Sequence, residues 1–131
     1  CGEDYYGFDD ALVATLRTIK ILAEANAPFS TLFKTFPQTY QAPENRPHCA
    51  DDKKAAVIEQ ITAHFQQDYE VNTLDGARID FGDGAWAGIR KSNTSPCLSI
   101  CIEARSPEKL AEVEAVVLSH LREYEEITFG E

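Results

Sequence analysis

The residues best suited to chemistry lie in one polar stretch, residues 90–96, with the sequence Arg-Lys-Ser-Asn-Thr-Ser-Pro. Arg90 carries a planar fork of N–H donors that matches the oxygens of a phosphate group. Ser92 and Thr94 add hydroxyl donors, and Asn93 adds an amide group. Asn93 also tolerates left-handed backbone angles, which can turn successive main-chain N–H groups toward one anion. The stretch therefore predicts a loop that binds a phosphate or a phosphosugar. The residue types alone leave a second interpretation open, a solvated hairpin without a ligand, because most hairpin loops bind nothing.

The elements that must hold this loop are two strands, predicted over residues 85–90 and 97–104. In the second of them, Leu98, Ile100 and Ile102 alternate with polar or small residues, which is typical of a strand with one buried face. A third strand is expected over residues 77–81, joined to residues 85–90 by the tight turn Gly82-Asp83-Gly84. Segment 43–49 is a candidate fourth strand at the edge of the sheet.

Two amphipathic helices are expected around these strands. The first runs from Lys53 to about Gln67 and is capped by Asp51 or Asp52. The second begins at Ser106-Pro107, with Ser as the cap and Pro at the first helical position. Each helix has a single apolar stripe, so both should cover the same face of the sheet. The predicted class is α+β, with an antiparallel sheet of about four strands covered on one face by two helices.

The first forty residues have a different pattern. Leu12, Leu16, Ile19 and Leu22 recur at helical spacing, which predicts an amphipathic helix over residues 9–25, followed by a short helix capped by Ser30. Three prolines between residues 37 and 47 then indicate a linker. We expect two parts, a helical segment over residues 1–40 and the α+β domain over residues 41–131.

Composition excludes several classes of function. The chain has 131 residues and a net charge of -10, which argues against a general surface for nucleic acid or anionic membrane. Cys97 and Cys101 would lie roughly 13 Å apart on a strand, too far for a disulfide. We therefore interpret the four cysteines as reduced thiols, which favours a cytoplasmic location, and their spacing predicts no metal site. The chain begins with Cys1 and contains no Met, which favours a piece of a longer protein.

Several motifs together closely resemble a known family. They are Asp75-Gly76-Ala77-Arg78-Ile79, the aromatic segment Gly84-Ala85-Trp86, the loop at residues 90–96, and Glu103-Ala104. Their order and spacing resemble the C-terminal domain of the α-D-phosphohexomutases, the phosphoglucomutase and phosphomannomutase enzymes. In that family the pattern Asp-Gly-x-(Arg/Lys)-(Ile/Val) leads to Arg-x-Ser-(Asn/Gly)-Thr-x-Pro. More weakly, residues 6–11 resemble the entry to the last helical part of the preceding domain, the third.

The resemblance implies a TATA-binding-protein-like domain that closes over an active site built by four domains. By position, Arg90, Ser92, Asn93 and Thr94 would bind the phosphate of a phosphosugar. The family moves a phosphoryl group between O1 and O6 of a hexose through a hexose 1,6-bisphosphate intermediate. Its phosphoserine and its Mg²⁺ ligands lie in the first two domains, so this chain would contain no catalytic residue and no metal ligand. Its partners would be the other three domains and the phosphosugar, and it would be inactive alone.

The sequence leaves two alternatives open. The first is the same domain from a phosphoglucosamine or phosphoacetylglucosamine mutase, since the third-domain segment that reads the sugar is missing; Gly2-Glu3 is not that motif. The second is a stand-alone, non-catalytic module of the same fold that binds a ligand or another protein.

Overall fold

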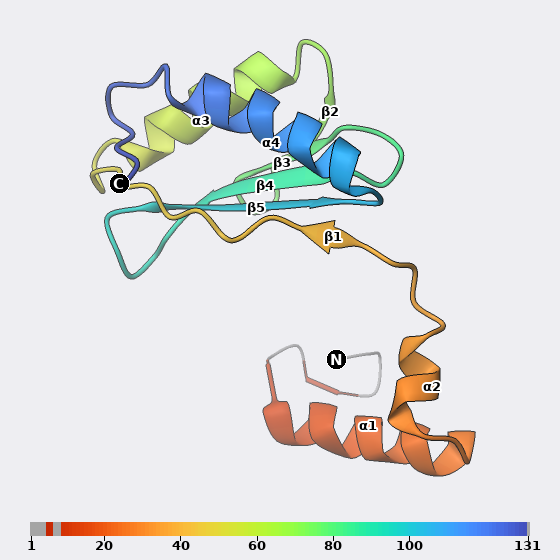
Figure 1. Ribbon diagram of the computed structural model, residues 1–131. Coiled ribbons are helices and arrows are strands. Elements are labelled where there is room, and N and C mark those ends of the chain that lie inside the picture. Colours follow the sequence, from red (N-terminus) through yellow and green to blue (C-terminus); the bar gives the residue numbers. More distant parts are fainter. Residues whose placement is uncertain (1–4, 7–8, 131) are drawn as a thin grey trace. The chain divides into compact units, whose positions relative to one another are not determined.

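The computed structural model describes residues 5–6 and 9–130 (Figure 1). Cys1, Gly2, Glu3, Gly7 and Phe8, which carry some of the sequence predictions, lie outside the described residues. The chain divides into two compact units, Cys1–Pro37 and Gln38–Glu131. The anion-binding stretch lies in the second unit, and each unit is described by itself.

The first unit contains the two predicted helices, α1 (Ala11–Ala25) and α2 (Phe29–Phe33). The side chain of Asp10 caps α1 by accepting a hydrogen bond of 3.0 Å from the Val13 N–H. None of the residues of α1 is buried, and its predicted apolar stripe is more than half exposed at Leu12, Leu16 and Ile19. The prediction that Ser30 caps α2 is wrong, because the N-cap is Pro28 and Ser30 lies inside the helix.

The second unit is built on an antiparallel sheet of five strands in the order β1-β5-β4-β3-β2. The α+β class is confirmed, but the number of strands exceeds the predicted four. Two of the five strands, β1 and β2, lie outside the predicted strands, since the candidate fourth strand was placed at residues 43–49. β2 has three residues, of which only Val71 is partly buried, so no alternating pattern marks it in the sequence. The strands are β1 (Tyr40–Gln41), β2 (Glu70–Asn72), β3 (Ala77–Asp80), β4 (Trp86–Lys91) and β5 (Leu98–Ala104).

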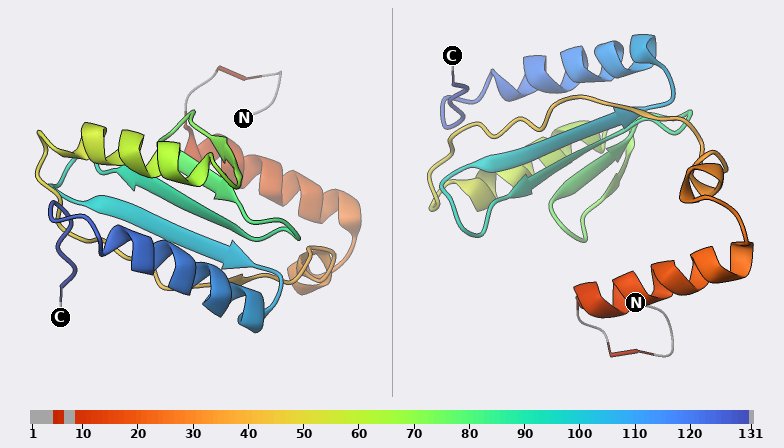
Figure 2. Two further views of the ribbon diagram at one scale, coloured as in Figure 1. Left: turned by 90° about the horizontal axis from the view of Figure 1, so that it is seen from above. Right: turned by 60° about the horizontal axis from the view of Figure 1, so that its bottom comes forward.

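Both remaining helices, α3 (Lys54–Phe65) and α4 (Pro107–Leu121), cover the same face of this sheet, as predicted (Figure 1). Seen from above, α3 lies over β3 and β4, and α4 lies over β5 (Figure 2). The core between the layers is closed by the apolar stripes of the helices and by alternate strand residues, among them Val57, Ile61, Phe65, Ile79, Ile89, Leu98, Ile100, Val113, Val117 and Leu121. Neither α3 nor α4 covers the opposite face of the sheet.

The start of α3 differs from the prediction in a way that matters for the site. Neither Asp51 nor Asp52 caps the helix, and the N-cap residue Lys53 makes no side-chain capping bond. The carboxylate of Asp51 instead lies 2.5 Å from the ammonium of Lys54. The start of α4 agrees with the prediction, because Ser106 accepts a hydrogen bond of 3.1 Å from the Lys109 N–H.

Segment 43–49 follows β5 without forming a continuous strand. Asn45 and Ile100 exchange both backbone hydrogen bonds, at 3.1 and 2.9 Å, and His48 forms a bridge with Cys97. Pro43 and Pro47 have no N–H to donate, which interrupts the ladder between these contacts. The segment nevertheless places side chains beside β5, where Glu44 contacts Ser99 and Arg46 contacts Cys97 next to the predicted loop.

Three of the cysteines, Cys49, Cys97 and Cys101, are free thiols, which confirms the prediction for them. Within residues 5–6 and 9–130, no helix combines the length and the apolar character that crossing a membrane requires.

Candidate anion-binding site

The predicted loop is shorter than its sequence suggested. Arg90 and Lys91 belong to the end of β4, and the loop proper begins at Ser92 (Figure 1). Its base is closed by the Ser92 N–H, which donates a hydrogen bond of 3.0 Å to the Cys97 carbonyl. Inside the loop, the Thr94 N–H donates to Ser92 Oγ at 3.4 Å. The backbone of a strand therefore sets the direction of Arg90, and a closed loop sets that of the other three predicted residues.

All four predicted residues line one cavity of about 260 Å³ at the end of the sheet. The other lining residues come from three separate segments of the chain. The complete lining is Arg46, Asp75, Arg90, Lys91, Ser92, Asn93, Thr94 and Ser99. Three cationic residues and a single carboxylate residue thus contribute to the lining, in a chain whose net charge is -10. This local excess of positive charge, together with two hydroxyls and an amide from the loop, suits a small anion.

The guanidinium of Arg90 is held by a carboxylate from a neighbouring turn. Arg90 Nη1 lies 3.5 Å from Asp75 Oδ2, and both side chains are more than half exposed, at 59% and 77%. An exposed ion pair of this kind contributes only about 0–1 kcal/mol. A doubly charged phosphate can therefore replace Asp75 as the partner of Arg90 at small cost, while Asp75 keeps the guanidinium at the cavity before an anion arrives.

The position of Asp75 depends on the glycine that follows it. Gly76 has φ +83°, and a Cβ at this position would overlap the carbonyl oxygen of Ile89 and lie 2.9 Å from the Cα of Arg90. The turn at residues 73–76 therefore packs directly against the backbone of β4 where Arg90 leaves it. Only a residue without a side chain allows this approach.

Arg46 is a functional candidate that sequence reasoning missed. Its Nη2 donates to Cys97 Sγ at 3.6 Å, and its Nη1 lies 3.7 Å from Glu44 Oε1. Glu44 in turn accepts a hydrogen bond of 2.7 Å from the hydroxyl of Ser99, the residue directly opposite Arg90 on β5. The hydrogen bond to Cys97 and then the charges of Cys97 and Glu44 raise the pKa of Arg46 above its ordinary value. Arg46 is thus a second charged arginine donor in the lining of the cavity.

A signal for Arg46 was present in the sequence but incomplete. Glu44 and Arg46 are two residues apart, so an extended segment 43–49 would place both on one face. Which face, and beside which strand, depends on the pairing of this segment with β5. The same pairing explains why Ser99 is buried beside Glu44, although it lies on the face of the sheet opposite α3 and α4.

Substituting Arg46 by Gln is expected to weaken binding of inorganic phosphate about three- to fivefold, because one partly exposed charge at the cavity is lost. The dissociation constant is measured by NMR titration of the 131-residue chain. Arg122→Gln is the matched control, since the Arg122 guanidinium lies over the Phe129 ring at 5.5 Å and does not line the cavity. Equal affinities for Arg46→Gln and Arg122→Gln would remove Arg46 from the site.

A second cavity, of about 380 Å³, adjoins the first on the face of the sheet opposite α3 and α4 and shares Asp75, Arg90 and Ser99 with it. Its floor includes Trp86, whose ring packs beside Gly88. The Arg78 guanidinium lies 4.9 Å from the centre of the Trp86 ring, so Arg78 stacks on this aromatic side chain. The cavity offers an apolar surface next to the anion-binding one.

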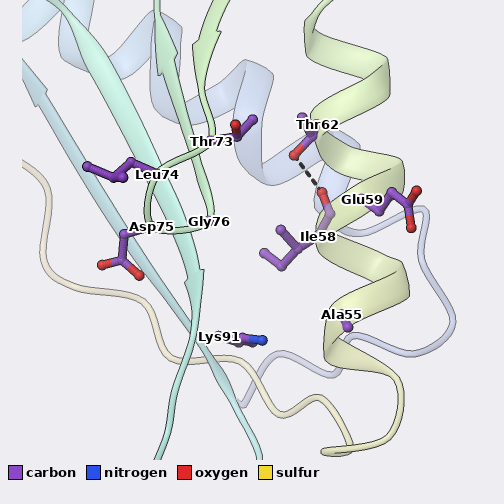
Figure 3. A pocket seen from close by; sticks show the side chains of 9 residues that line it. All are labelled: Ala55, Ile58, Glu59, Thr62, Thr73, Leu74, Asp75, Gly76 and Lys91. Atoms are coloured by element: carbon purple, nitrogen blue, oxygen red, sulfur yellow. Dashed lines mark hydrogen bonds between the residues drawn. The ribbon is translucent and has the colours of Figure 1, made fainter.

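A third cavity, of about 460 Å³, lies between α3 and the turn at residues 73–76 (Figure 3). Ala55, Ile58, Glu59 and Thr62 form its wall on α3, where the hydroxyl of Thr62 is already bonded to the Ile58 carbonyl at 2.7 Å. Glu59 and Asp75 bring two carboxylates to this cavity and Lys91 a single ammonium. Its charge is therefore opposite to that of the anion-binding cavity.

The side chains at the site do not suit a metal ion. Guanidinium and ammonium groups repel cations, and the described part of the chain contains no group of three or more His, Cys, Asp and Glu that could hold a metal. What the arrangement can do chemically is to bind and orient an anion.

The chain is similar to known proteins of one family. Residues 46–120 match the family model described as "Phosphoglucomutase/phosphomannomutase, C-terminal domain". The chain is 33% identical over 121 residues to a phosphomannomutase/phosphoglucomutase from Pseudomonas syringae pv. tomato. This match covers 92% of the chain and 26% of that protein. It is 31% identical over 110 residues to a probable phosphoglucosamine mutase from Methanothermobacter thermautotrophicus, covering 81% of the chain and 24% of that protein.

Among solved structures, the chain is similar to a phosphoglucomutase/phosphomannomutase family protein from Burkholderia thailandensis. The TM-score is 0.73 at 30% sequence identity, and the match covers 91% of this chain and 25% of that one. The chain thus spans about a quarter of the length of the relatives it matches.

Proposed function

Since the chain belongs to the phosphoglucomutase/phosphomannomutase family and corresponds to its C-terminal domain, we propose that residues 38–131 bind the phosphate group of a hexose phosphate. The single observation that carries this proposal is the convergence of Arg90, Ser92, Asn93 and Thr94 on one cavity with an excess of positive charge. The two hydroxyls and the amide of this set would orient the phosphate, and Arg90 would bind two of its oxygens at once.

The longer protein to which this domain would belong is proposed to be an isomerase that moves a phosphoryl group between O1 and O6 of a hexose. Such an enzyme must hold one phosphate while the other is transferred, and then reorient the bisphosphorylated intermediate. Residues that grip a phosphate without reacting serve this purpose, because they fix the geometry of the transfer. On a domain that closes over the substrate they also help to exclude water from the reacting groups.

In this division of labour the present chain would break no bond. Its cationic cavity does not fit Mg²⁺, so the metal of such an enzyme would be held by residues of other domains. The phosphoserine would lie outside this chain as well. We therefore propose that the chain alone binds phosphosugars but has no mutase activity. The free thiols of Cys49, Cys97 and Cys101 support a reducing compartment such as the cytoplasm.

The first unit is proposed to be the last part of the preceding domain. Leu12, Leu16 and Ile19 lie on one side of α1 and are each more than half exposed. An exposed apolar stripe of this kind is expected where another part of a protein covers a helix. The residues of the preceding domain would supply that cover.

NMR titration of the 131-residue chain with glucose 1-phosphate tests the proposal. The backbone amides of residues 90–94 are expected to shift, with a dissociation constant on the order of millimolar, because the contacts from other domains are missing. Inorganic phosphate should shift the same amides, and glucose without phosphate should shift none of them. Shifts confined to other surfaces would refute the assignment of the site.

A second candidate is the phosphoglucosamine mutase activity, favoured by the 31% identity to the Methanothermobacter protein. The proposed phosphate ligands would not distinguish the two activities, because hexose phosphates and hexosamine phosphates both carry the phosphate group. Comparing mutase rates of the full-length protein on glucose 1-phosphate and glucosamine 1-phosphate distinguishes the two.

A further inference from the structure

Lys54 is buried at the beginning of α3, directly behind the anion-binding loop. Lys54 is 4% exposed, and it is the one buried charged residue among residues 5–6 and 9–130. A lysine is rarely buried unless its charge is paired. Here its Nζ donates to the carbonyl oxygens of Ser92 at 2.8 Å and of Ser95 at 2.6 Å. Asp51 is the third partner, at 2.5 Å.

The two carbonyls that Lys54 binds lie on either side of Asn93 and Thr94, two of the loop residues assigned to the phosphate. Ser92 precedes Asn93 and Thr94, and Ser95 follows them. No described peptide bond is cis, so each peptide group points its C=O and the next N–H in opposite directions. Because the Ser92 carbonyl points inward to Lys54, the Asn93 N–H points away from it. The Ser95 carbonyl also points inward, but the next residue is Pro96, which has no N–H, so this peptide group directs no donor to the cavity.

From this geometry we propose that Lys54 is a positioning residue of the phosphate site. Its ammonium holds the Ser92 and Ser95 carbonyls in the interior, so that the Asn93 N–H and the hydroxyls of Ser92 and Thr94 face the cavity before the ligand arrives. The inference rests on the proposed function, because it assigns Lys54 a role in phosphate binding that acts through the loop and without contact to the ligand.

The physical basis is preorganisation. A six-residue loop without an internal anchor would have to be ordered when the phosphate binds, and that ordering would reduce the affinity. Because Lys54 makes its contacts in the folded chain without any ligand, the loss of conformational entropy of the loop occurs on folding and not on phosphate binding. The side chain of Asp51 is 76% exposed, so water screens its carboxylate. Asp51 can therefore orient the Lys54 ammonium while that ammonium stays bonded to the two loop carbonyls. A neutral side chain of the same length would fill the space but leave both carbonyls without their donor.

Lys54→Met in the 131-residue chain tests the inference against a structural control. Val57→Ala removes a buried side chain on the same helix, one turn further on, that is not in the lining of the cavity. We expect Lys54→Met to weaken binding of inorganic phosphate about tenfold and to lower the heteronuclear NOE of residues 92–95 in the free chain. Val57→Ala should reduce stability in urea but change neither quantity. Lys54→Arg, which keeps a charged donor, should bind within about threefold of the wild type.

The outcomes separate the inference from the proposed function. If the wild type binds phosphate through residues 90–94 and Lys54→Met binds within twofold of it, the positioning role is wrong and the proposed function stands. If phosphate moves no amide of residues 90–94 in the wild type, the proposed function fails and the inference fails with it. Should Lys54→Met not fold, Lys54→Gln takes its place, with an expected loss of about threefold; unchanged affinity and loop order in that variant would equally overturn the inference.

Discussion

Replacing Arg90 by Ala in the full-length protein, which we propose to be a mutase, is expected to lower kcat/KM by a factor of about 30 to 1000, which corresponds to roughly 2–4 kcal/mol. The loss is large because the Arg90 guanidinium can bind two phosphate oxygens at once, from a strand end that fixes its direction. Its partner in the free chain, Asp75, would then face the phosphate with an uncompensated negative charge. Both changes oppose binding of the substrate phosphate.

Steady-state kinetics at low substrate concentration measure this effect directly. Arg90→Lys should recover part of the loss, because an ammonium supplies the charge without the paired donors. Arg122→Ala, away from the cavity, should leave kcat/KM unchanged. If Arg90→Ala retained turnover near that of the wild type under these conditions, the phosphate assignment of Arg90 would be wrong.

Replacing Gly76 by Ala is expected to destabilise the second unit by about 2–4 kcal/mol, from a combination of backbone strain and steric overlap. The residue has φ +83°, and its new Cβ would meet main-chain atoms of Ile89 and Arg90, which cannot move aside as the end of a side chain can. The turn would have to separate from β4, and Asp75 would leave Arg90. Phosphate binding should weaken together with stability.

Urea unfolding followed by the fluorescence of Trp86, the single tryptophan of the chain, measures this loss for the second unit. Gly82→Ala is a matched control. Gly82 also has positive φ, at +76°, but a Cβ there would meet nothing within 4 Å. It should therefore cost only the strain, about 1 kcal/mol. Equal losses for the two variants would show that the contact between the turn and β4 contributes nothing.

Much of the local structure could be predicted from the sequence because it is encoded at short range. The turn Gly82-Asp83-Gly84 joins β3 to β4, with positive φ at all three residues. Ser106 and Pro107 start α4 as expected. In β5, apolar residues recur at every second position, and this alternation correctly predicted that Leu98, Ile100 and Ile102 are buried. Each of these features follows from backbone preferences or side-chain periods within a few residues.

The four candidate phosphate ligands were predicted in the same way, as neighbours in one stretch, and the structure brings all of them to one cavity. Their assignment to a phosphate stays a prediction until the titration is done. The sequence by itself therefore determined the α+β class, the family and the candidate donors of the loop.

Only the tertiary structure decided what surrounds that loop. Lys54 meets Ser92 across 38 residues, Arg46 meets Cys97 across 51, and Glu44 meets Ser99 across 55. No periodicity links residues so far apart, because such pairs exist only after the sheet has formed and segment 43–49 has paired with β5. Asp51, expected as a helix cap, is instead a partner of Lys54, whose ammonium is held by the loop. The donors of residues 90–96 were thus visible in the sequence, whereas the buried lysine and the second arginine that complete their site depend on the fold.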